Sequence, residues 1–158
     1  MRKLCVFFGL VAVSLFAAQS SAFAGFNDAK RLVVVMKASD EVPLCEPATN
    51  AARGSAVFKI TDAAAGTVNY KLVANNLPGD ITMAHIHQAP VGTPGPIVQA
   101  LMLTTGAENG VIARGTFTNS TVVAGLQSNP SAYYVNVHSS VCMPGVIRGQ
   151  FGDRGSAK

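Results

Sequence analysis

Short β-branched and apolar segments alternate with turn residues along this chain, and this alternation constrains the fold more than any other feature. The expected strands are residues 31–37, 55–61, 66–74, 81–88, 97–103, 110–118, 132–138 and 146–151. Turn sequences such as Leu77-Pro78-Gly79-Asp80 and Pro144-Gly145 separate them. About eight short strands at regular spacing predict an all-β domain, an antiparallel Greek-key β-sandwich or barrel. Residues 119–126 instead begin with capping residues and predict one or two helical turns.

The first 24 residues have the pattern of a secretory signal peptide. Arg2 and Lys3 precede an apolar run, and Ala22-Phe23-Ala24 is a small-x-small cleavage sequence. Cleavage after Ala24 would remove Cys5 and leave residues 25–158 as a single domain, with its core at residues 32–151. The apolar run is shorter than a membrane-spanning helix needs, and no later segment approaches that length. We therefore expect a secreted or periplasmic protein without a membrane span.

The net charge of the expected mature chain is small and gives little support for a nucleic-acid partner. Without Arg2 and Lys3, 10 of the 12 basic residues remain, against 8 acidic residues. No run of basic residues interleaved with aromatic residues is present, so we expect no nucleic-acid partner. Lys30-Arg31 and the C-terminal basic residues, Arg148 included, are interpreted as scattered surface charges.

Two cysteines remain in the expected mature chain, Cys45 and Cys142. An even number of cysteines in an oxidising compartment favours one disulfide, and a pair of metal thiolates is the alternative. A disulfide here would close a loop of nearly a hundred residues, for which chain entropy gives at most about 4–5 kcal/mol.

The three histidines of the chain fall on two of the predicted strands. His85 and His87 are two residues apart, and His138 ends the strand at residues 132–138. Alternate residues of a strand share a face, about 6–7 Å apart at the backbone. If Ala84 and Ile86 point into the sandwich together with the valines of the later strand, then all three histidines point out of it. This parity predicts three imidazoles on the sheet surface or rim.

Such an arrangement suits a metal site or an incidental polar patch. Neutral imidazole binds copper, zinc, iron or nickel, and Met83 shares the face of His85 and His87. A thioether beside imidazoles favours copper, with Met83 as a candidate fourth ligand and another transition metal as the alternative. Exposed histidine also occurs without any function, so the parity alone leaves both interpretations open.

Other catalytic chemistry has weak support in the sequence. Ser139 and Ser140 follow His138, but neighbours on a strand point apart, and no G-x-S-x-G elbow is present. The acidic residues, Asp40-Glu41 among them, lie in expected turns or termini, where a solvated carboxylate is the ordinary interpretation. We therefore assign no catalytic residue.

Four motifs stand out in order along the chain: Glu41-Val42-Pro43, Ala84-His85-Ile86-His87, Tyr134-Val135-Asn136-Val137-His138 and the final segment 144–151. Together they resemble the CHRD domain, a family named for the repeated domain of chordin that also occurs as single-domain secreted bacterial proteins. The resemblance spans residues 32–151. It implies an exported Greek-key β domain with no general enzymatic activity. The family usually has an acidic residue just before Ile-Arg-Gly, where this chain has Val146.

The order of the histidine motifs is also similar to that of copper-zinc superoxide dismutase. That likeness implies a superoxide-dismutase-like or immunoglobulin-like sandwich, with His85, His87 and His138 matching copper ligands. The zinc loop and its bridging histidine have no counterpart here. Three hypotheses follow: a secreted module that binds a metal ion, copper favoured; an extracytoplasmic adhesion or interaction module with incidental histidines; and a minimal dismutase-like enzyme. The sequence leaves the metal, the protein partner and the oligomeric state open.

Overall fold

The structure is a computed structural model that describes residues 30–106 and 108–152. The expected signal peptide and Cys5 lie outside these residues. Eight strands form one antiparallel sheet in the order β5-β4-β7-β8-β1-β2-β3-β6. The strands are β1 (Arg31–Lys37), β2 (Arg53–Asp62), β3 (Thr67–Asn75), β4 (Ile81–Gln88), β5 (Ile97–Ala100), β6 (Gly110–Thr118), β7 (Tyr133–Ser139) and β8 (Ile147–Gln150).

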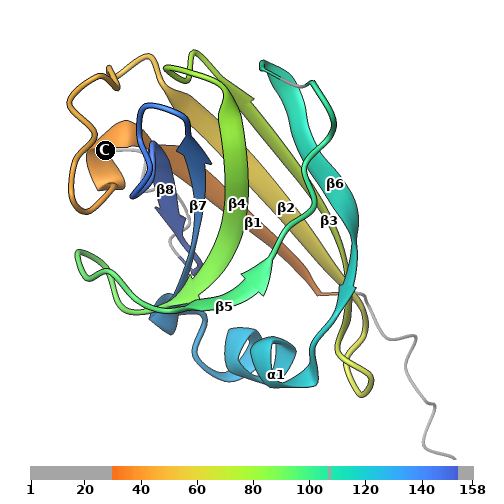
Figure 1. Cartoon of the computed structure of the whole chain (residues 1–158). Helices are drawn as coiled ribbons and strands as arrows, with labels where there is room; N and C mark the ends of the chain where they lie inside the picture. The colour runs from red at the N-terminus through yellow and green to blue at the C-terminus, as the bar shows by residue number, and fades with distance from the viewer. Residues whose placement is uncertain (1–29, 107, 153–158) are drawn as a thin grey trace, which may run out of the picture.

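The sheet curls so that its two halves face each other across one apolar core (Figure 1). Strands β1, β2, β3 and β6 form one wall, and β4, β5, β7 and β8 form the other. Each wall turns one apolar face towards this core, which is the physical origin of the two-layer shape. The prediction of an all-β, sandwich-like domain is therefore confirmed.

The core is built from the inward residues of both walls. Phe58 on β2 has no exposed surface, and its ring centroid lies 5.1 Å from that of Phe151 and 6.3 Å from that of Tyr70. From the other wall, Ile86 and Val135 are also fully buried in this core. Aromatic rings packed at such distances contribute beyond their buried area.

One helix lies at an end of the sandwich. α1 (Ser120–Ser128) begins two residues after β6 and is followed by the 3-10 turn η2 (Pro130–Ala132). The Asn119 side chain caps it by accepting a hydrogen bond from the Val122 N–H at 3.1 Å. Val122, Val123 and Leu126 face the core. The predicted helical segment is confirmed, and it extends two residues beyond the expected end.

Three connections matter for the site. A second 3-10 turn, η1 (Ala38–Asp40), follows β1 and opens a long connection to β2. Residues 89–96 join β4 to β5, and residues 140–146 join β7 to β8. Hydrogen bonds from buried side chains of β4, β7 and β8 reach carbonyl groups in the last two connections. These connections therefore cover the outer face of that wall. No described helix is long and apolar enough to cross a membrane.

Candidate metal centre

Pairing of β4 with β7 brings the three histidines together from positions about fifty residues apart. His85 lies opposite Asn136, His87 opposite Tyr134, and Met83 opposite His138. Residues paired across an antiparallel ladder project to the same face. Ala84 and Ile86 point into the core, so the histidines occupy the opposite, outer face of the wall, which we call the histidine face.

The imidazole nitrogens converge. His85 Nδ1 lies 3.1 Å from His138 Nε2. One nitrogen from each of the three rings lies within 4.8 Å of the other two. The ring centroids are 4.9 Å apart for His85 and His138, and 5.6 Å apart for His85 and His87. Three nitrogens at these separations could hold a metal ion between them.

Backbone carbonyl groups determine which nitrogen of two rings carries the proton. His87 Nδ1 lies 2.8 Å from the Gly95 carbonyl oxygen, and His138 Nδ1 lies 2.8 Å from the Met143 carbonyl oxygen. A carbonyl only accepts, so both Nδ1 atoms are the N–H donors and both Nε2 atoms carry free lone pairs. A histidine whose other nitrogen donates to a carbonyl is the usual arrangement of a metal ligand.

The nitrogen of His87 that faces the other rings has no hydrogen-bond partner, and His85 is the third ring of the cluster. His87 Nε2 is buried and has no hydrogen-bond partner. Because His138 Nε2 accepts, His85 Nδ1 donates to it across their 3.1 Å separation. The three nitrogens that face one another are therefore His85 Nδ1, His87 Nε2 and His138 Nε2. If His85 moves its proton from Nδ1 to Nε2, all three present lone pairs without any change of net charge.

Burial keeps all three rings neutral. His85, His87 and His138 are 7%, 7% and 5% exposed, so the prediction that they lie on an open surface or rim is wrong. Parity placed them on the correct face, but the connections at residues 89–96 and 140–146 cover that face. Burial, with His138 and His87 nearby, lowers the pKa of His85 to about 4. Burial also lowers the pKa of His87 and that of His138. Neutral imidazole is the form that binds metal.

A stacked column of side chains supports His87. The Tyr134 ring stacks on the His87 ring with centroids 4.7 Å apart and planes 10° apart. The Arg148 guanidinium carbon lies 3.4 Å from the centre of the Tyr134 ring. Gly95 N–H donates to the Tyr134 hydroxyl at 3.1 Å, and Gly95 also orients His87. Sequence reasoning missed Tyr134 as part of the site, although its parity places it on the face of the histidines.

Arg148 fixes the covering connection. Its guanidinium donates to the carbonyl oxygens of Thr93 and Pro90, both at 3.0 Å. The side chain is 2% exposed, so its interpretation as a scattered surface charge is wrong. Two carbonyl acceptors and an aromatic face compensate for the lost hydration of the cation. No sequence pattern distinguishes this arginine from a solvated one, because the partners are main-chain groups of a distant turn.

Glu41 is a second buried charge that the sequence assigned to solvent. It is 2% exposed, and burial raises its pKa to about 7, against smaller lowering effects of the Val42 N–H bond, Arg148 and Asn136. Its Oε1 accepts from Val42 N–H at 3.0 Å, whereas Oε2 has no partner. The Asn136 side-chain oxygen is also unpartnered. Unsatisfied polar groups thus gather beside the histidines.

The structure pairs Cys45 with Cys142, as predicted, with their Cα atoms 5.8 Å apart. The bond joins the β1–β2 connection to the β7–β8 connection. Met143, whose carbonyl orients His138, follows Cys142 directly. The disulfide therefore holds one of the two covering connections in place.

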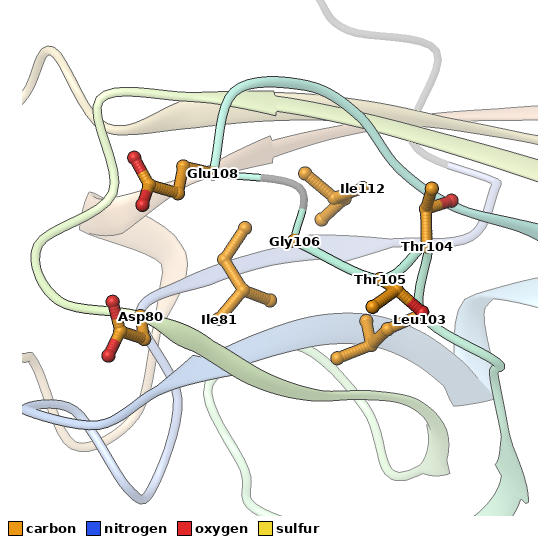
Figure 2. A pocket seen from close by; sticks show the side chains of 8 residues that line it. All are labelled: Asp80, Ile81, Leu103, Thr104, Thr105, Gly106, Glu108 and Ile112. Carbon is orange, nitrogen blue, oxygen red and sulfur yellow. The ribbon is translucent and has the colours of Figure 1, made fainter.

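A pocket of about 270 Å³ lies elsewhere, between the start of β4 and the connection from β5 to β6 (Figure 2). Figure 2 shows the carboxylates of Asp80 and Glu108 at one side of it, with Thr104 and Thr105 at the other and Ile81 between them. The pocket contains none of the histidines. Its acidic groups are exposed at the edge of the domain, where solvation accounts for them.

The CHRD domain model matches residues 32–151. The chain belongs to the CHRD domain family. The resemblance seen in its motifs is thereby confirmed over the part of the chain that carries all three histidines. In the CHRD domain of this chain, Val146, which directly precedes Ile147-Arg148-Gly149, has no exposed surface. No curated protein and no solved structure matches the chain.

Proposed function

We propose that this protein is an exported CHRD-domain protein that binds one transition-metal ion, copper favoured, through His85, His87 and His138. Its role would be sequestration, delivery or redox protection. The proposal is carried by one observation: nitrogens of three neutral, buried imidazoles lie within 4.8 Å of one another. The disulfide and membership of a family of extracellular domains support export.

The unpartnered nitrogen of His87 argues against an incidental cluster. A buried polar atom without a hydrogen bond costs roughly 1–3 kcal/mol. The His87 ring is held by the hydrogen bond from its Nδ1 to the Gly95 carbonyl, which leaves Nε2 without such a bond. A ligand that accepts a lone pair would compensate for that cost, and a metal ion is such a ligand. An adhesion module with incidental histidines gives no reason to retain this arrangement.

The donor set favours a borderline or soft metal. Three neutral nitrogens suit Cu, Zn, Ni or Fe and do not suit Mg²⁺ or Ca²⁺, which prefer oxygen. Among divalent ions of the first row, copper binds such sites most tightly. Met83 lies opposite His138 in the β4–β7 ladder and is 36% exposed, so it is our candidate fourth ligand for copper. Because the rings are neutral, binding requires the proton shift within His85 and no loss of a proton from the three rings.

The test is calorimetric titration of the purified protein with Cu(II) and, separately, with Zn(II). We expect one ion per chain and tighter binding of copper. His85→Ala, His87→Ala and His138→Ala should each weaken copper binding at least about tenfold, which corresponds to about 1.4 kcal/mol. Gln88→Ala is the matched control, because Gln88 is exposed and follows His87 on the same strand. Unchanged affinity in all three histidine variants would contradict the proposal.

A second measurement separates binding from catalysis. The copper-loaded protein and an equal concentration of free copper are compared for superoxide turnover. Burial of all three rings restricts access to the ion, so we expect no turnover above that of free copper. Turnover above that level, abolished by His87→Ala, would instead establish the dismutase-like enzyme.

A further inference from the structure

Six basic side chains lie on the outer face of the wall formed by β1, β2, β3 and β6, which we call the cationic face. They come from all four strands: Arg31, Lys37, Arg53, Lys59, Lys71 and Arg114. All six are exposed. Among the basic residues that the structure describes, only Lys30 and Arg148 lie elsewhere. The face is hidden in the sequence because each strand contributes only one or two charges.

The strand register places these charges in like-charged pairs. Arg31 lies opposite Lys59, and Lys37 opposite Arg53, in the β1–β2 ladder. Lys71 lies opposite Arg114 in the β3–β6 ladder. Like charges directly opposite each other across strands destabilise a sheet. Three such pairs on one face are therefore an unfavourable arrangement unless anions neutralise them.

The four strands themselves offer almost no acidic side chains that could pair with these six basic residues. Their only acidic residue is Asp62, at the end of β2. Its carboxylate is engaged in the turn that follows, where it accepts from Ala65 N–H at 2.9 Å. The cationic face points away from the core, because alternating residues such as Val34 and Met36 on β1 are buried in it. Within these four strands the six basic side chains are therefore open to anions of another molecule.

We propose that the cationic face binds an anionic polysaccharide, a polymer that carries sulfate or carboxylate groups at intervals. Each like-charged pair can receive one anionic group. Six residues along β1 separate Arg31 from Lys37, which places two of the pairs about 20 Å apart. Lys71 and Arg114 lie between these pairs along the strand direction, two strands further on. A single compact anion cannot span this distance, whereas an extended polymer can.

The other side chains of the face distinguish among polyanions. The exposed large apolar residues here are Val33 and Val35, at 52% and 45% exposure, and no aromatic ring lies on this face. Single-stranded nucleic acid needs rings for stacking, and a membrane surface needs larger apolar groups for insertion. Asn69 and Thr116, hydrogen-bonded to each other at 2.7 Å, add polar groups suited to sugar hydroxyls. A second copy of the chain is disfavoured because two cationic faces repel each other.

The test measures binding of the whole protein to dextran sulfate and polygalacturonate at physiological ionic strength, with neutral dextran as the uncharged polymer. We expect binding to both anionic polymers that weakens steeply with salt, because released counterions drive it. A variant with one change in each pair, Arg53→Gln, Lys59→Gln and Lys71→Gln, should lose at least about thirtyfold in affinity. All three residues are exposed, so the fold should persist, as circular dichroism would verify.

The control variant lowers the net charge by the same amount at exposed positions off this face: Asn50→Asp, Thr105→Glu and Gln127→Glu. It should lose less than about threefold. Equal losses in the two variants would overturn the proposal, because net charge rather than this face would then explain binding. No binding to either polymer would also overturn it. So would tighter binding to duplex DNA or to phosphatidylglycerol vesicles than to the polysaccharides.

Discussion

The two walls of the sheet differ in the burial of their outer faces: one outer face is exposed, and the other is covered. On the β1–β2–β3–β6 wall, buried and exposed residues alternate: on β1, Val34 and Met36 are buried, whereas Val33 and Val35 are exposed. On the other wall, every residue of β7 is buried. Both walls supply one face to the same core, so the difference arises from the connections that cover the histidine face. Burying polar side chains costs free energy. Proteins keep such unfavourable burial mainly at functional sites, which agrees with the proposed metal site on this face.

The largest expected effect concerns the disulfide that holds a covering connection. Cys45→Ser should lower the free energy of unfolding by about 4 kcal/mol, because the bond closes a loop with a sequence separation of 97 residues. Chemical denaturation without reductant measures it. With reductant, the variant and the unaltered protein should have similar stability. A loss of the same size in reductant would show that the serine damages packing and that the bond contributes little.

The next effect compares one arginine from each wall. Arg148→Ala should lower the free energy of unfolding by about 2–3 kcal/mol, because it removes two charge-assisted hydrogen bonds to the covering connection and the cation on the Tyr134 ring. Arg114→Ala on the cationic face should change it by less than about 0.5 kcal/mol. Denaturant midpoints of the two variants measure the difference. Equal effects would show that the covering of the histidine face contributes nothing to stability.

The smallest effect depends on pH and concerns Glu41. Its pKa is raised from 4.5 to about 7, so the folded state binds an extra proton between these pH values. Its contribution to stability is therefore present below pH 4.5 and is lost as pH rises through 7. Glu41→Gln does not titrate, so relative to the unaltered protein it should gain about 1–2 kcal/mol in stability between pH 5 and pH 8.

Glu46→Gln is the control for this comparison, because Glu46 is exposed in the same connection. Its stability relative to the unaltered protein should not vary between pH 5 and pH 8. The three histidines are present in every variant, so their own titration cancels. A pH-independent difference for Glu41→Gln would mean that Glu41 is solvated after all.

The sequence predicted the elements of both walls well. Residues 31–37, 81–88 and 110–118 match β1, β4 and β6 to the residue, because alternating polarity and flanking turns mark the ends of these strands. The expected strand at residues 97–103 is shorter in the structure and ends at Ala100. Parity also identified the histidine face, since a strand has only two faces.

The sequence did not predict which connections cover the histidine face, or that strand register would gather basic residues on the cationic face. Glu41, Arg148 and Tyr134 are buried by connections whose paths depend on long-range hydrogen bonds, such as that from Arg148 to Pro90. The cationic face depends on register between four strands, which a linear scan for basic runs cannot detect. In both cases the deciding information is tertiary, and local patterns specify only the direction of each side chain.

The central claim is that three imidazoles meet at one metal ion, and anomalous X-ray diffraction tests it most directly. Crystals of the copper-loaded protein, measured at the copper absorption edge, should show one peak about 2 Å from His85 Nδ1, His87 Nε2 and His138 Nε2. A peak located away from these nitrogens, with the three rings still in contact only with one another, would contradict the account.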